Sequence, residues 1–495
     1  MKQNSLHSPD FQNKSRIYYC FIAIILLVFI LLFETSTSPL YENIHGYDSA
    51  YFRYIGSAIL KGKVPYRDLW DNKGPVLFFI QAVGALTGVH QHKILLIFPL
   101  QFASLLITVF FLEKADREMN AGIKKRLLRF TLFTFCAMPV FAAVIEGGNL
   151  SEEWSLPMIS CSLYFFIKYA AEAENHHSYA HPPRYAFIHG LCFGLIAFIR
   201  FNNIISICAG LFVTALILIA HRQWKNILQN ILFGLLGIAV IAVPVCAWFI
   251  TKHALKDMLY AAFLSGLKYV KTEVHSELNA YSLVIRYLPL LFCLVIILIH
   301  IIREHKCRLL DIFMLTIIGT NGIMLISFNI YLHYFLLFFP VFFLTLLLYV
   351  NIPSAVEILM IIVQTGFFLM NCNNLFHEAR VLNQHLSFPT ANYYFPRSER
   401  DSMIAIDTRA DIYLLSGMTP VSRFAAYQSI HLFLEPEFYE EFKTDITTKE
   451  PKWIITPCKA YDFPFVNDLL DKKYLYRFND DFFCFYQIRD LSTEP

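Results

Sequence analysis

Long apolar runs separated by short polar segments dominate the first 370 positions of the chain. Most of these runs are long enough to cross a hydrocarbon core of about 30 Å as a helix. They lack the alternation of apolar and polar positions that marks membrane-spanning β-barrels. The pattern therefore predicts a polytopic α-helical membrane protein with about eleven spans. The predicted spans are Ile17–Phe33, Ile94–Leu112, Leu127–Ile145, Trp154–Ala170, Tyr185–Ile199, Ile204–Ala220, Ile227–Ile250, Tyr287–Ile302, Ile312–Phe328, Tyr334–Val350 and Ala355–Met370.

A shorter apolar segment, Val76–Val89, is predicted to lie at the membrane surface or to re-enter rather than to cross. The choice rests on Lys and Arg, because loops rich in these residues stay cytoplasmic. Without this crossing, the basic stretches Lys114–Arg129, Arg222–Lys225 and Arg303–Arg308 all fall on the cytoplasmic side. The N-terminus is then cytoplasmic, and everything after Met370 lies on the outer side of the membrane.

Composition supports the membrane assignment. Hydrophobic residues make up 56% of the 495 positions and charged residues only 16%, whereas soluble proteins carry about 25% charge. The formal net charge is +3, and basic residues cluster only in the predicted cytoplasmic loops. We therefore expect membrane lipids as surroundings and no nucleic-acid partner.

After Met370 the chain changes to short alternating runs, which predict a small extracytoplasmic α/β domain at 372–495. The membrane domain is then 1–371, and its first outer loop is 34–93. The elements expected in the outer domain are strands at Met403–Asp407, Ile412–Leu415, Trp453–Ile455 and Phe482–Tyr486 and a helix at Phe438–Asp445.

The 11 cysteines are scattered without C-x-x-C spacing, which is typical of small core residues rather than metal ligands. Two of them, Cys458 and Cys484, lie in the predicted outer domain. They form a disulfide if that compartment is oxidising and stay free thiols otherwise. Both alternatives are compatible with the sequence.

Polar residues gather at the outer ends of the predicted spans. The first outer loop concentrates acidic, basic and aromatic residues between Asp48 and Lys73. Further along the chain, the same face is expected to carry Asn149, Glu152, Glu153, Arg200, His333 and Tyr334. A membrane face that collects carboxylates, cations and a histidine is the expected place for chemistry.

These residue types suit displacement at a sugar anomeric carbon that bears a lipid phosphate. Such a reaction needs a base for the acceptor's proton and cations for the charge that builds on the departing phosphate. Asp48 suits the first task, and Lys73 and Arg200 suit the second.

Four motifs on this face carry a family resemblance. The first outer loop has Asp48 followed by Val64-Pro-Tyr-Arg-Asp68 and Asp71-Asn-Lys-Gly-Pro75; the others are Gly147-Gly-Asn-Leu-Ser-Glu-Glu153, Phe198-Ile-Arg-Phe-Asn-Asn203 and His333-Tyr-Phe-Leu-Leu-Phe-Phe-Pro340. In this order they resemble GT-C glycosyltransferases. The likeness is to the bacterial branch related to protein O-mannosyltransferases and the lipid A aminoarabinose transferase, that is, to glycosyltransferase family 39.

The resemblance implies inverting transfer of a sugar from a polyprenyl-phosphate donor to an acceptor outside the membrane, the acceptor being an envelope glycan, lipid or protein. Asp48 matches the catalytic acidic residue of the first loop, and Lys73 matches a basic residue that contacts the lipid phosphate. Glu152 or Glu153 matches an acidic position linked in relatives to acceptor, donor or metal binding. We add Arg67 and Arg200 as further phosphate-binding candidates and Asn149, His333 and Tyr334 as positioning candidates.

One departure concerns metal. Many relatives carry a second acidic residue beside the first, whereas this chain has Ser49. Dependence on a divalent metal is therefore left open, and no other cofactor is expected. Gly74 and Pro75 stand where relatives often have two prolines, which resembles a bacterial subgroup with poorly defined substrates.

Each site residue also has a structural interpretation. Asp48 suits the N-cap of a helix starting near Ser49. Lys73, Arg67 and Arg200 suit anchors among lipid headgroups. Glu152 and Glu153 suit the first turn of a helix, whose dipole favours acidic side chains. His333 and Tyr334 suit an interfacial aromatic belt.

The competing function class is a transporter or flippase of a lipid-linked saccharide, which would also present cations to phosphate. Transporters commonly have two related halves and ionisable residues near the bilayer midplane. The predicted spans contain few such charges and show no internal repeat, so transfer is the favoured function.

Overall fold

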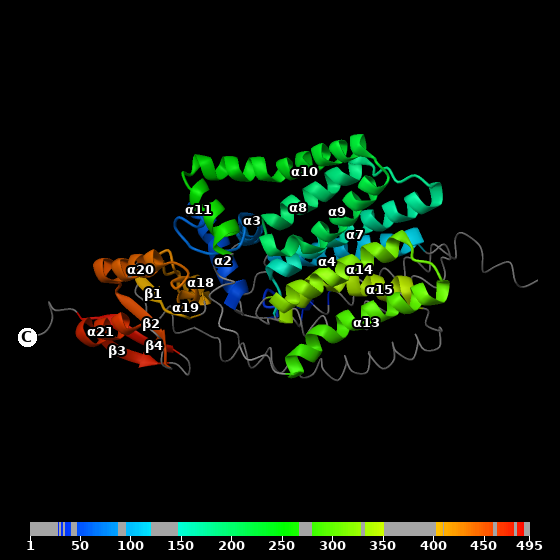
Figure 1. Cartoon of the computed structure of the whole chain (residues 1–495). Coiled ribbons are helices and arrows are strands. Elements are labelled where there is room, and N and C mark those ends of the chain that lie inside the picture. Colours follow the sequence, from blue (N-terminus) through cyan, green and yellow to red (C-terminus); the bar gives the residue numbers. More distant parts are fainter. Residues whose placement is uncertain are drawn as a thin grey trace, which may run out of the picture. The chain divides into compact units, whose positions relative to one another are not determined.

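The computed structural model describes most of the chain as two compact units (Figure 1). The helical unit comprises Met1–Ser38, Pro99–Val245 and His275–Ala379, and the mixed unit comprises Pro39–Phe98, Cys246–Val274 and Arg380–Pro495. The described residues are 28, 31–32, 35–40, 47–87, 96–119, 147–266, 280–327, 332–350, 402–408, 410–458, 463–479 and 483–489. The predicted domain boundary after residue 371 falls outside them and stays a prediction.

Helices build the helical unit, and glycines let some of them approach closely. Its elements are α4 (Ile97–Met119), α7 (Ser151–His176), α8 (Pro183–Ala197), η2 (Phe201–Ile204), α9 (Ile205–Ala220), α10 (Trp224–Thr251), α13 (Ala280–Glu304), α14 (Leu309–Ser327), η4 (Leu332–Leu337) and α15 (Phe339–Tyr349). A Cβ at Gly190 on α8 would lie 2.0 Å from the carbonyl oxygen of Gly234 on α10, so these two backbones touch. Small residues at such crossings are typical of membrane helices.

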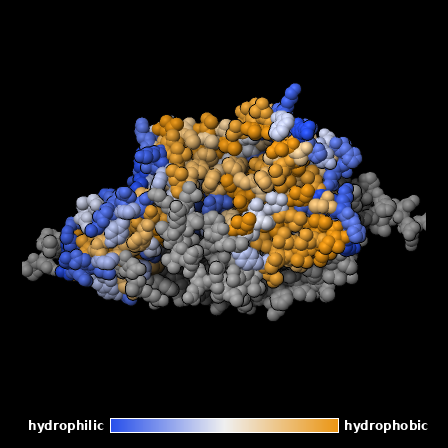
Figure 2. Space-filling model, in the orientation of Figure 1, coloured by the Kyte–Doolittle hydropathy of each residue, from blue (hydrophilic) through white to orange (hydrophobic). Residues whose placement is uncertain are grey.

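Four of the described helical segments are long and apolar enough to cross a membrane, namely Ile97–Met119, Phe201–Ala220, Trp224–Thr251 and Tyr287–Glu304. Helix α10 exposes its apolar side chains rather than burying them, as Leu228 at 69% and Val243 at 63% show. Figure 2 shows this surface as predominantly hydrophobic. A helix that is apolar on its exposed face fits a lipid surrounding.

Other predicted spans correspond to shorter or less apolar helices, and the total of eleven stays a prediction. The predicted spans Leu127–Ile145 and Ala355–Met370, and most of Ile17–Phe33, lie outside the described residues. Helix α3 (Pro75–Ala85), which has 11 residues, covers most of the segment Val76–Val89. At 1.5 Å per residue this helix is about 16 Å long, too short to cross a hydrocarbon core of about 30 Å.

In the mixed unit, helix α2 (Tyr47–Leu60) packs tightly on α3. The contact depends on Gly56, where a Cβ would lie 2.5 Å from backbone and side-chain atoms of Gln81. Gly74 precedes α3 in an extended conformation at φ −76°, and Pro75 occupies the first helical turn. That φ lies within the range that proline also adopts.

The mixed unit also contains a four-stranded sheet of order β1-β2-β4-β3. Strand β1 (Met403–Ala405) runs parallel to β2 (Trp453–Pro457), while β4 (Phe483–Ile488) is antiparallel to both β2 and β3 (Tyr474–Asn479). The accompanying helices are α11 (Leu255–Leu259), η3 (Tyr260–Leu264), α18 (Asp411–Ser416), α19 (Gln428–His431), α20 (Pro436–Lys449) and α21 (Pro464–Lys473).

The predicted strands at Met403, Trp453 and Phe482 and the helix at Phe438 correspond to β1, β2, β4 and α20. The predicted strand Ile412–Leu415 is wrong, because these residues form helix α18. Gly417 ends that helix in the left-handed conformation at φ 68°, a common helix stop. A short apolar run does not by itself distinguish a strand from a helix.

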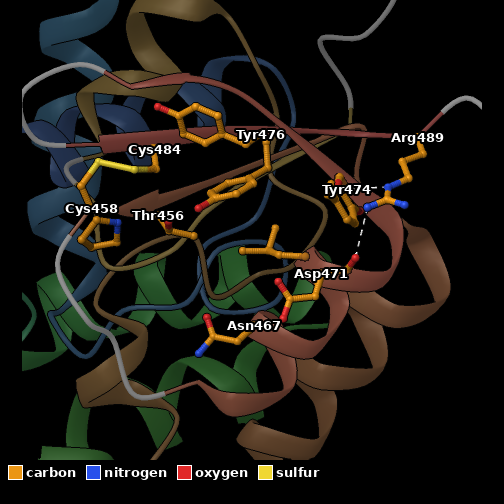
Figure 3. Close-up of a pocket in the computed structure, with 11 residues that line it drawn as sticks. Thr456, Cys458, Asn467, Asp471, Tyr474, Tyr476, Cys484 and Arg489 are labelled. Carbon is orange, nitrogen blue, oxygen red and sulfur yellow. Dashed lines mark hydrogen bonds between the residues drawn. A yellow bond between two sulfur atoms is a disulfide. The ribbon is translucent and has the colours of Figure 1, made fainter.

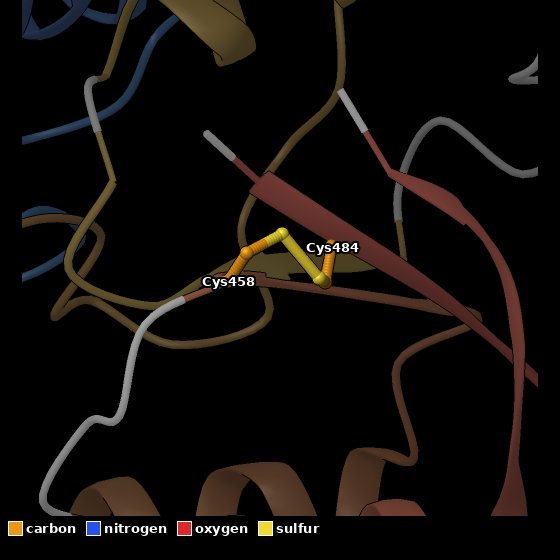
Figure 4. The surroundings of a disulfide bond; sticks show 2 residues. All are labelled: Cys458 and Cys484. Carbon is orange, nitrogen blue, oxygen red and sulfur yellow. A yellow bond between two sulfur atoms is a disulfide. The ribbon is translucent and has the colours of Figure 1, made fainter. Parts of the chain in front are cut away.

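The two outer cysteines are paired in the structure. Cys458, just after β2, forms a disulfide with Cys484 on β4 (Figure 4). The bond links neighbouring strands, since Thr456 and Cys484 are partners in the β2–β4 register. Of the two alternatives, the structure therefore contains the disulfide, and the oxidising compartment stays a prediction.

Candidate functional site

Asp48 lies in the first turn of α2, near the helix N-terminus. The helix begins at Tyr47, so Asp48 is inside the helix and not at the N-cap position. The hydroxyl of Tyr427 donates a hydrogen bond of 2.7 Å to Asp48 Oδ1. The positive end of the helix dipole also favours a negative charge at this position. A carboxylate held by a hydroxyl donor suits a general base.

Lys73 lies close to the same tyrosine. Its ammonium group is 5.9 Å from the ring centroid of Tyr427 and 5.5 Å from that of Phe52. Asp71 Oδ1 is 3.7 Å from Lys73 Nζ and also accepts the backbone N–H of Lys73 at 2.8 Å. The Lys73 side chain is 12% exposed and that of Asp71 is fully buried. Asp71 therefore fixes both the backbone and the charge of Lys73.

Electrostatics link these groups into one cluster, the Asp48 cluster: Asp48, Asp71, Lys73, Tyr427 and His431. Burial raises the pKa of Asp71, and Asp48 adds to the rise while Lys73 opposes it. Burial and the charge of Asp48 raise the pKa of Tyr427, which therefore stays protonated and able to donate. Burial and Lys73 lower the pKa of His431 to about 3, so this ring is neutral.

The raised pKa of Asp71 predicts a pH dependence of stability. The folded chain holds this proton to a higher pH than the unfolded chain. The resulting stabilisation is fully present below the ordinary carboxyl pKa of about 4 and is lost as the pH rises through the raised value. Asp71→Asn should flatten this decline, measured by thermal unfolding of the purified protein across the acidic and neutral range.

Asp68, in the same loop, serves as a control because its pKa is shifted in the opposite direction to that of Asp71. Burial acts to raise the pKa of Asp68, but hydrogen bonds from Arg67 and from the Val64 N–H outweigh it and lower the pKa. Asp68 therefore stabilises above the ordinary carboxyl pKa, and this contribution is lost as the pH falls. Asp68→Asn should remove stability at neutral pH. Superimposable profiles for Asp71→Asn and the unchanged chain would contradict the assignment.

The loop between α2 and α3 is held by aromatic hydroxyls and a partly buried arginine. Tyr66 Oη donates to the carbonyl of Lys73 at 2.7 Å, and Tyr51 Oη donates to that of Trp70. Arg423 reaches the carbonyl of Tyr66 at 3.2 Å, and its guanidinium lies 5.3 Å from the Trp70 ring. These contacts order the loop that presents Lys73.

Arg67, a predicted phosphate ligand, points elsewhere in this loop. Its guanidinium forms two hydrogen bonds with Asp68, at 2.9 and 3.0 Å, and a third with the carbonyl of Lys252 at 2.9 Å. The side chain is 44% exposed. Its hydrogen bonds are thus directed to the protein, and its phosphate role stays a prediction.

Arg53 on α2 is a group that the sequence analysis did not single out. It is 2% exposed, and neither terminal nitrogen has a hydrogen-bond partner among the described residues. Burial lowers its pKa to about 10. A buried guanidinium without hydrogen-bond partners is costly, and such groups often mark functional sites. In the sequence, Arg53 was marked as a candidate site residue only by its place in the first outer loop, five residues after Asp48.

A second cluster lies in the helical unit, around Arg200. Arg200 Nη1 is 2.5 Å from Glu152 Oε1, and Nη2 donates to Tyr334 Oη at 2.9 Å. His333, 8% exposed, contacts the Tyr334 ring edge-on at 4.8 Å between ring centroids. Four predicted residues, Glu152, Arg200, His333 and Tyr334, are thereby brought together. Arg200 is 17% exposed on its side chain and Glu152 only 1%.

Glu153 and Asn149 hold the turn before α7. Gly147, Gly148 and Asn149 have φ values of 85°, 68° and 60°, so three successive residues adopt the left-handed conformation. Glu153 Oε2 accepts the backbone N–H of Asn149 at 2.6 Å, and Gln101 donates to the same carboxylate. A carboxylate that reaches back to N–H groups before its own helix acts as a cap. The structure therefore assigns Glu153 a positioning task and leaves any substrate contact as a prediction.

The predicted residues thus form two clusters, one in each compact unit. That all of them share one outer membrane face stays a prediction. Within the described part of the chain, no group of three or more His, Cys, Asp and Glu side chains is placed to hold a metal ion.

Comparison with known proteins decides the family. A family model described as the putative competence-induced protein Ccs4 N-terminal domain matches residues 11–358. The chain belongs to this family. No curated protein matches the Ccs4-family chain in a sequence comparison.

Solved structures define the fold of this Ccs4-family chain. ArnT from Cupriavidus metallidurans bound to undecaprenyl phosphate aligns with a TM-score of 0.61 at 13% identity, over 97% of this chain and 99% of ArnT. The apo form of ArnT gives 0.59 at 12% identity, over 95% and 97%. The Archaeoglobus fulgidus oligosaccharyltransferase gives 0.48 at 11% identity, over 89% and 69%. The resemblance to GT-C proteins is confirmed at the level of the fold, and the chain is a helical membrane protein.

Proposed function

We propose that the protein is a membrane glycosyltransferase that moves a sugar from a polyprenyl-phosphate donor to an envelope acceptor. The GT-C fold supports it, because the full-length structural match, ArnT, binds undecaprenyl phosphate. The observation that carries the proposal is the Asp48 cluster, where a carboxylate oriented by Tyr427 and a lysine oriented by Asp71 share one tyrosine ring. A base and a cation are the two groups that such a transfer requires.

In the proposed reaction Asp48 takes the proton of the acceptor nucleophile. The acceptor oxygen or nitrogen then forms a bond to the anomeric carbon, and the bond from that carbon to the phosphate oxygen breaks. The polyprenyl phosphate leaves with the electron pair, and Lys73 stabilises its negative charge. Attack from the side opposite the phosphate inverts the anomeric configuration.

Tyr427 and His431 support the base without replacing it. Because the pKa of Tyr427 is raised, its hydroxyl stays protonated and donates to Asp48. His431 is neutral because its pKa is lowered to about 3, so it adds no second positive charge beside Lys73.

Arg200 is proposed as a second cation of the reaction. Its partly exposed guanidinium is held by Glu152 and Tyr334, which leaves it oriented but not fully enclosed. A planar guanidinium suits phosphate oxygens.

The outer side of a bacterial cytoplasmic membrane is the proposed location, since the Cys458–Cys484 disulfide fits an oxidising compartment.

Mass spectrometry of envelope glycans tests the proposal in cells that lack the chain, produce it, or produce Lys73→Gln. We expect one glycosidic linkage to depend on the chain, and its polyprenyl-phosphate sugar to accumulate when the chain is absent. Lys73→Gln should lower the amount of product formed per unit time by about 10²-fold, the usual loss when one charge-stabilising donor is removed.

The matched control is Lys63→Gln, because Lys63 is an exposed lysine of the same loop outside the Asp48 cluster. This variant should transfer sugar at the normal rate. If the purified protein instead moves a lipid-linked saccharide between leaflets and forms no glycosidic bond, the transporter class is correct and the proposal fails.

A further inference from the structure

A separate pocket of about 350 Å³ lies in the mixed unit, between helix α21 and the neighbouring strands β2, β3 and β4 (Figure 3). None of the residues that line it belongs to the Asp48 cluster. Its volume is at the lower end of the range of about 300–1,000 Å³ found for ligand pockets. A ligand of this pocket is therefore distinct from the donor phosphate described above.

Helix and strand periodicity place different chemistry on the two sides of this pocket. Asn467 and Asp471 are four residues apart on α21, so they project from the same helix face. Tyr474 and Tyr476 are two residues apart on β3, so they project from the same sheet face. Figure 3 shows the two α21 side chains on the helix side and the tyrosines on the sheet side. A polar wall thus faces an aromatic wall.

The aromatic wall has an exposed ring in a fixed orientation. Tyr476 is 53% exposed, although it is a large aromatic residue. Its ring meets the edge of Tyr486 on β4 at 5.7 Å between centroids and an interplanar angle of 72°. A rigid exposed ring offers an apolar face to a ligand at little cost in conformational entropy.

The polar wall provides donors and acceptors but almost no net charge. Asn467 supplies both kinds of group, Asp471 supplies acceptors and Arg489 supplies donors. Arg489 is fixed at the pocket edge by hydrogen bonds to the carbonyls of Tyr474 at 3.3 Å and Asp471 at 3.2 Å. One cation and one anion in the lining disfavour both a free phosphate and an ammonium ligand.

We propose that this pocket binds a saccharide of one or two rings. Sugars combine apolar C–H faces, which stack on aromatic rings, with neutral hydroxyl groups that both donate and accept. These two properties match the tyrosine wall and the Asn467–Asp471 wall, respectively. An acyl chain would leave the polar wall unsatisfied. The binding site is independent of the proposed transfer reaction and exists whether or not the chain transfers sugar.

Saturation-transfer NMR on the full chain in lipid nanodiscs tests the proposal. Nanodiscs are required because the headgroups of glucoside and maltoside detergents would compete. The probes are maltose, lactose, mannobiose and N,N′-diacetylchitobiose, each at millimolar concentration. We expect saturation transfer to at least one disaccharide, and about tenfold weaker binding in Tyr476→Ala, since the stacking face is lost.

Two variants make the test specific. Tyr476→Phe keeps the ring and should bind within about twofold of the unchanged chain. Phe433→Ala removes an equally exposed aromatic ring, 54% exposed, that does not line the pocket, and should leave binding unchanged. The proposal is overturned if the folded chain shows no transfer to any of the four disaccharides. It is also overturned if Tyr476→Ala binds normally, or if inorganic phosphate binds in their place and Arg489→Gln abolishes that binding.

Discussion

Replacing Asp48 with Asn should lower the rate of sugar transfer by about 10²–10⁴-fold, the usual contribution of a general base. The amide cannot take the acceptor's proton. Its oxygen can still accept the hydrogen bond from Tyr427, and the side chain has nearly the same volume, so the fold should be preserved. The loss should therefore appear in kcat, with little change in the thermal stability of the purified protein.

Asp68→Asn is the matched control for this experiment. It removes a carboxylate from the same outer loop, where Asp68 pairs with Arg67 at the protein surface. Transfer should proceed at a normal rate in this variant, because the hydrogen bonds of Asp68 go to Arg67 and to the Val64 N–H and not to the Asp48 cluster. Full activity of Asp48→Asn in a folded and inserted protein would refute the assignment of the base.

Breaking the Glu152–Arg200 pair should have the largest effect on stability. The carboxylate of Glu152 is almost completely buried, and Arg200 is its ion-pair partner at 2.5 Å. Arg200→Gln leaves a buried negative charge without its cation. Removing one partner of a buried pair typically costs about 3–5 kcal/mol, whereas an exposed pair contributes about 0–1 kcal/mol. Thermal unfolding in nanodiscs measures the difference.

The double variant Glu152→Gln with Arg200→Gln separates charge burial from packing. It removes both charges, and Ser151 Oγ, which donates to Glu152 Oε2 at 2.9 Å, can donate to the new amide. We expect the double variant to be more stable than Arg200→Gln alone. A single variant that loses less than about 1 kcal/mol would show that water reaches the pair.

Residues adjacent in sequence were the predictable part of the site. Asp48 and Lys73 follow from a polar loop in an apolar chain, and the motif around Lys73 already contains Asp71. Tyr427 could not be predicted, because 379 positions separate it from Asp48 and only folding brings the two together. His431 was missed for the same reason.

The membrane helices were predictable because their apolar length is itself the signal. Shorter elements were not. The run Ile412–Leu415 fits a strand or a helix equally, and only Gly417 after it marks a helix end. Strand β3 was missed although two sequence signals pointed to it. Every second residue from Tyr474 to Phe478 is aromatic, and Asn479 followed by two aspartates is typical of a turn between two strands.

Glu153 has a structural task that its motif did not reveal. The family resemblance pointed to Glu152 or Glu153 for acceptor, donor or metal binding, and that role stays a prediction. The structure adds that the Glu153 carboxylate accepts the N–H of Asn149 in a left-handed turn. That turn depends on dihedral angles, which residue types alone indicate only through two glycines.

The hydrogen bond from Tyr427 to Asp48 bears on where the proposed site ends along the chain. The family model ends at residue 358, and Tyr427 and His431 lie beyond it. The proposed base and the hydroxyl that orients it therefore lie on opposite sides of that boundary. In the proposed mechanism, the segment that carries Tyr427 contributes to the site as much as the loop that carries Asp48.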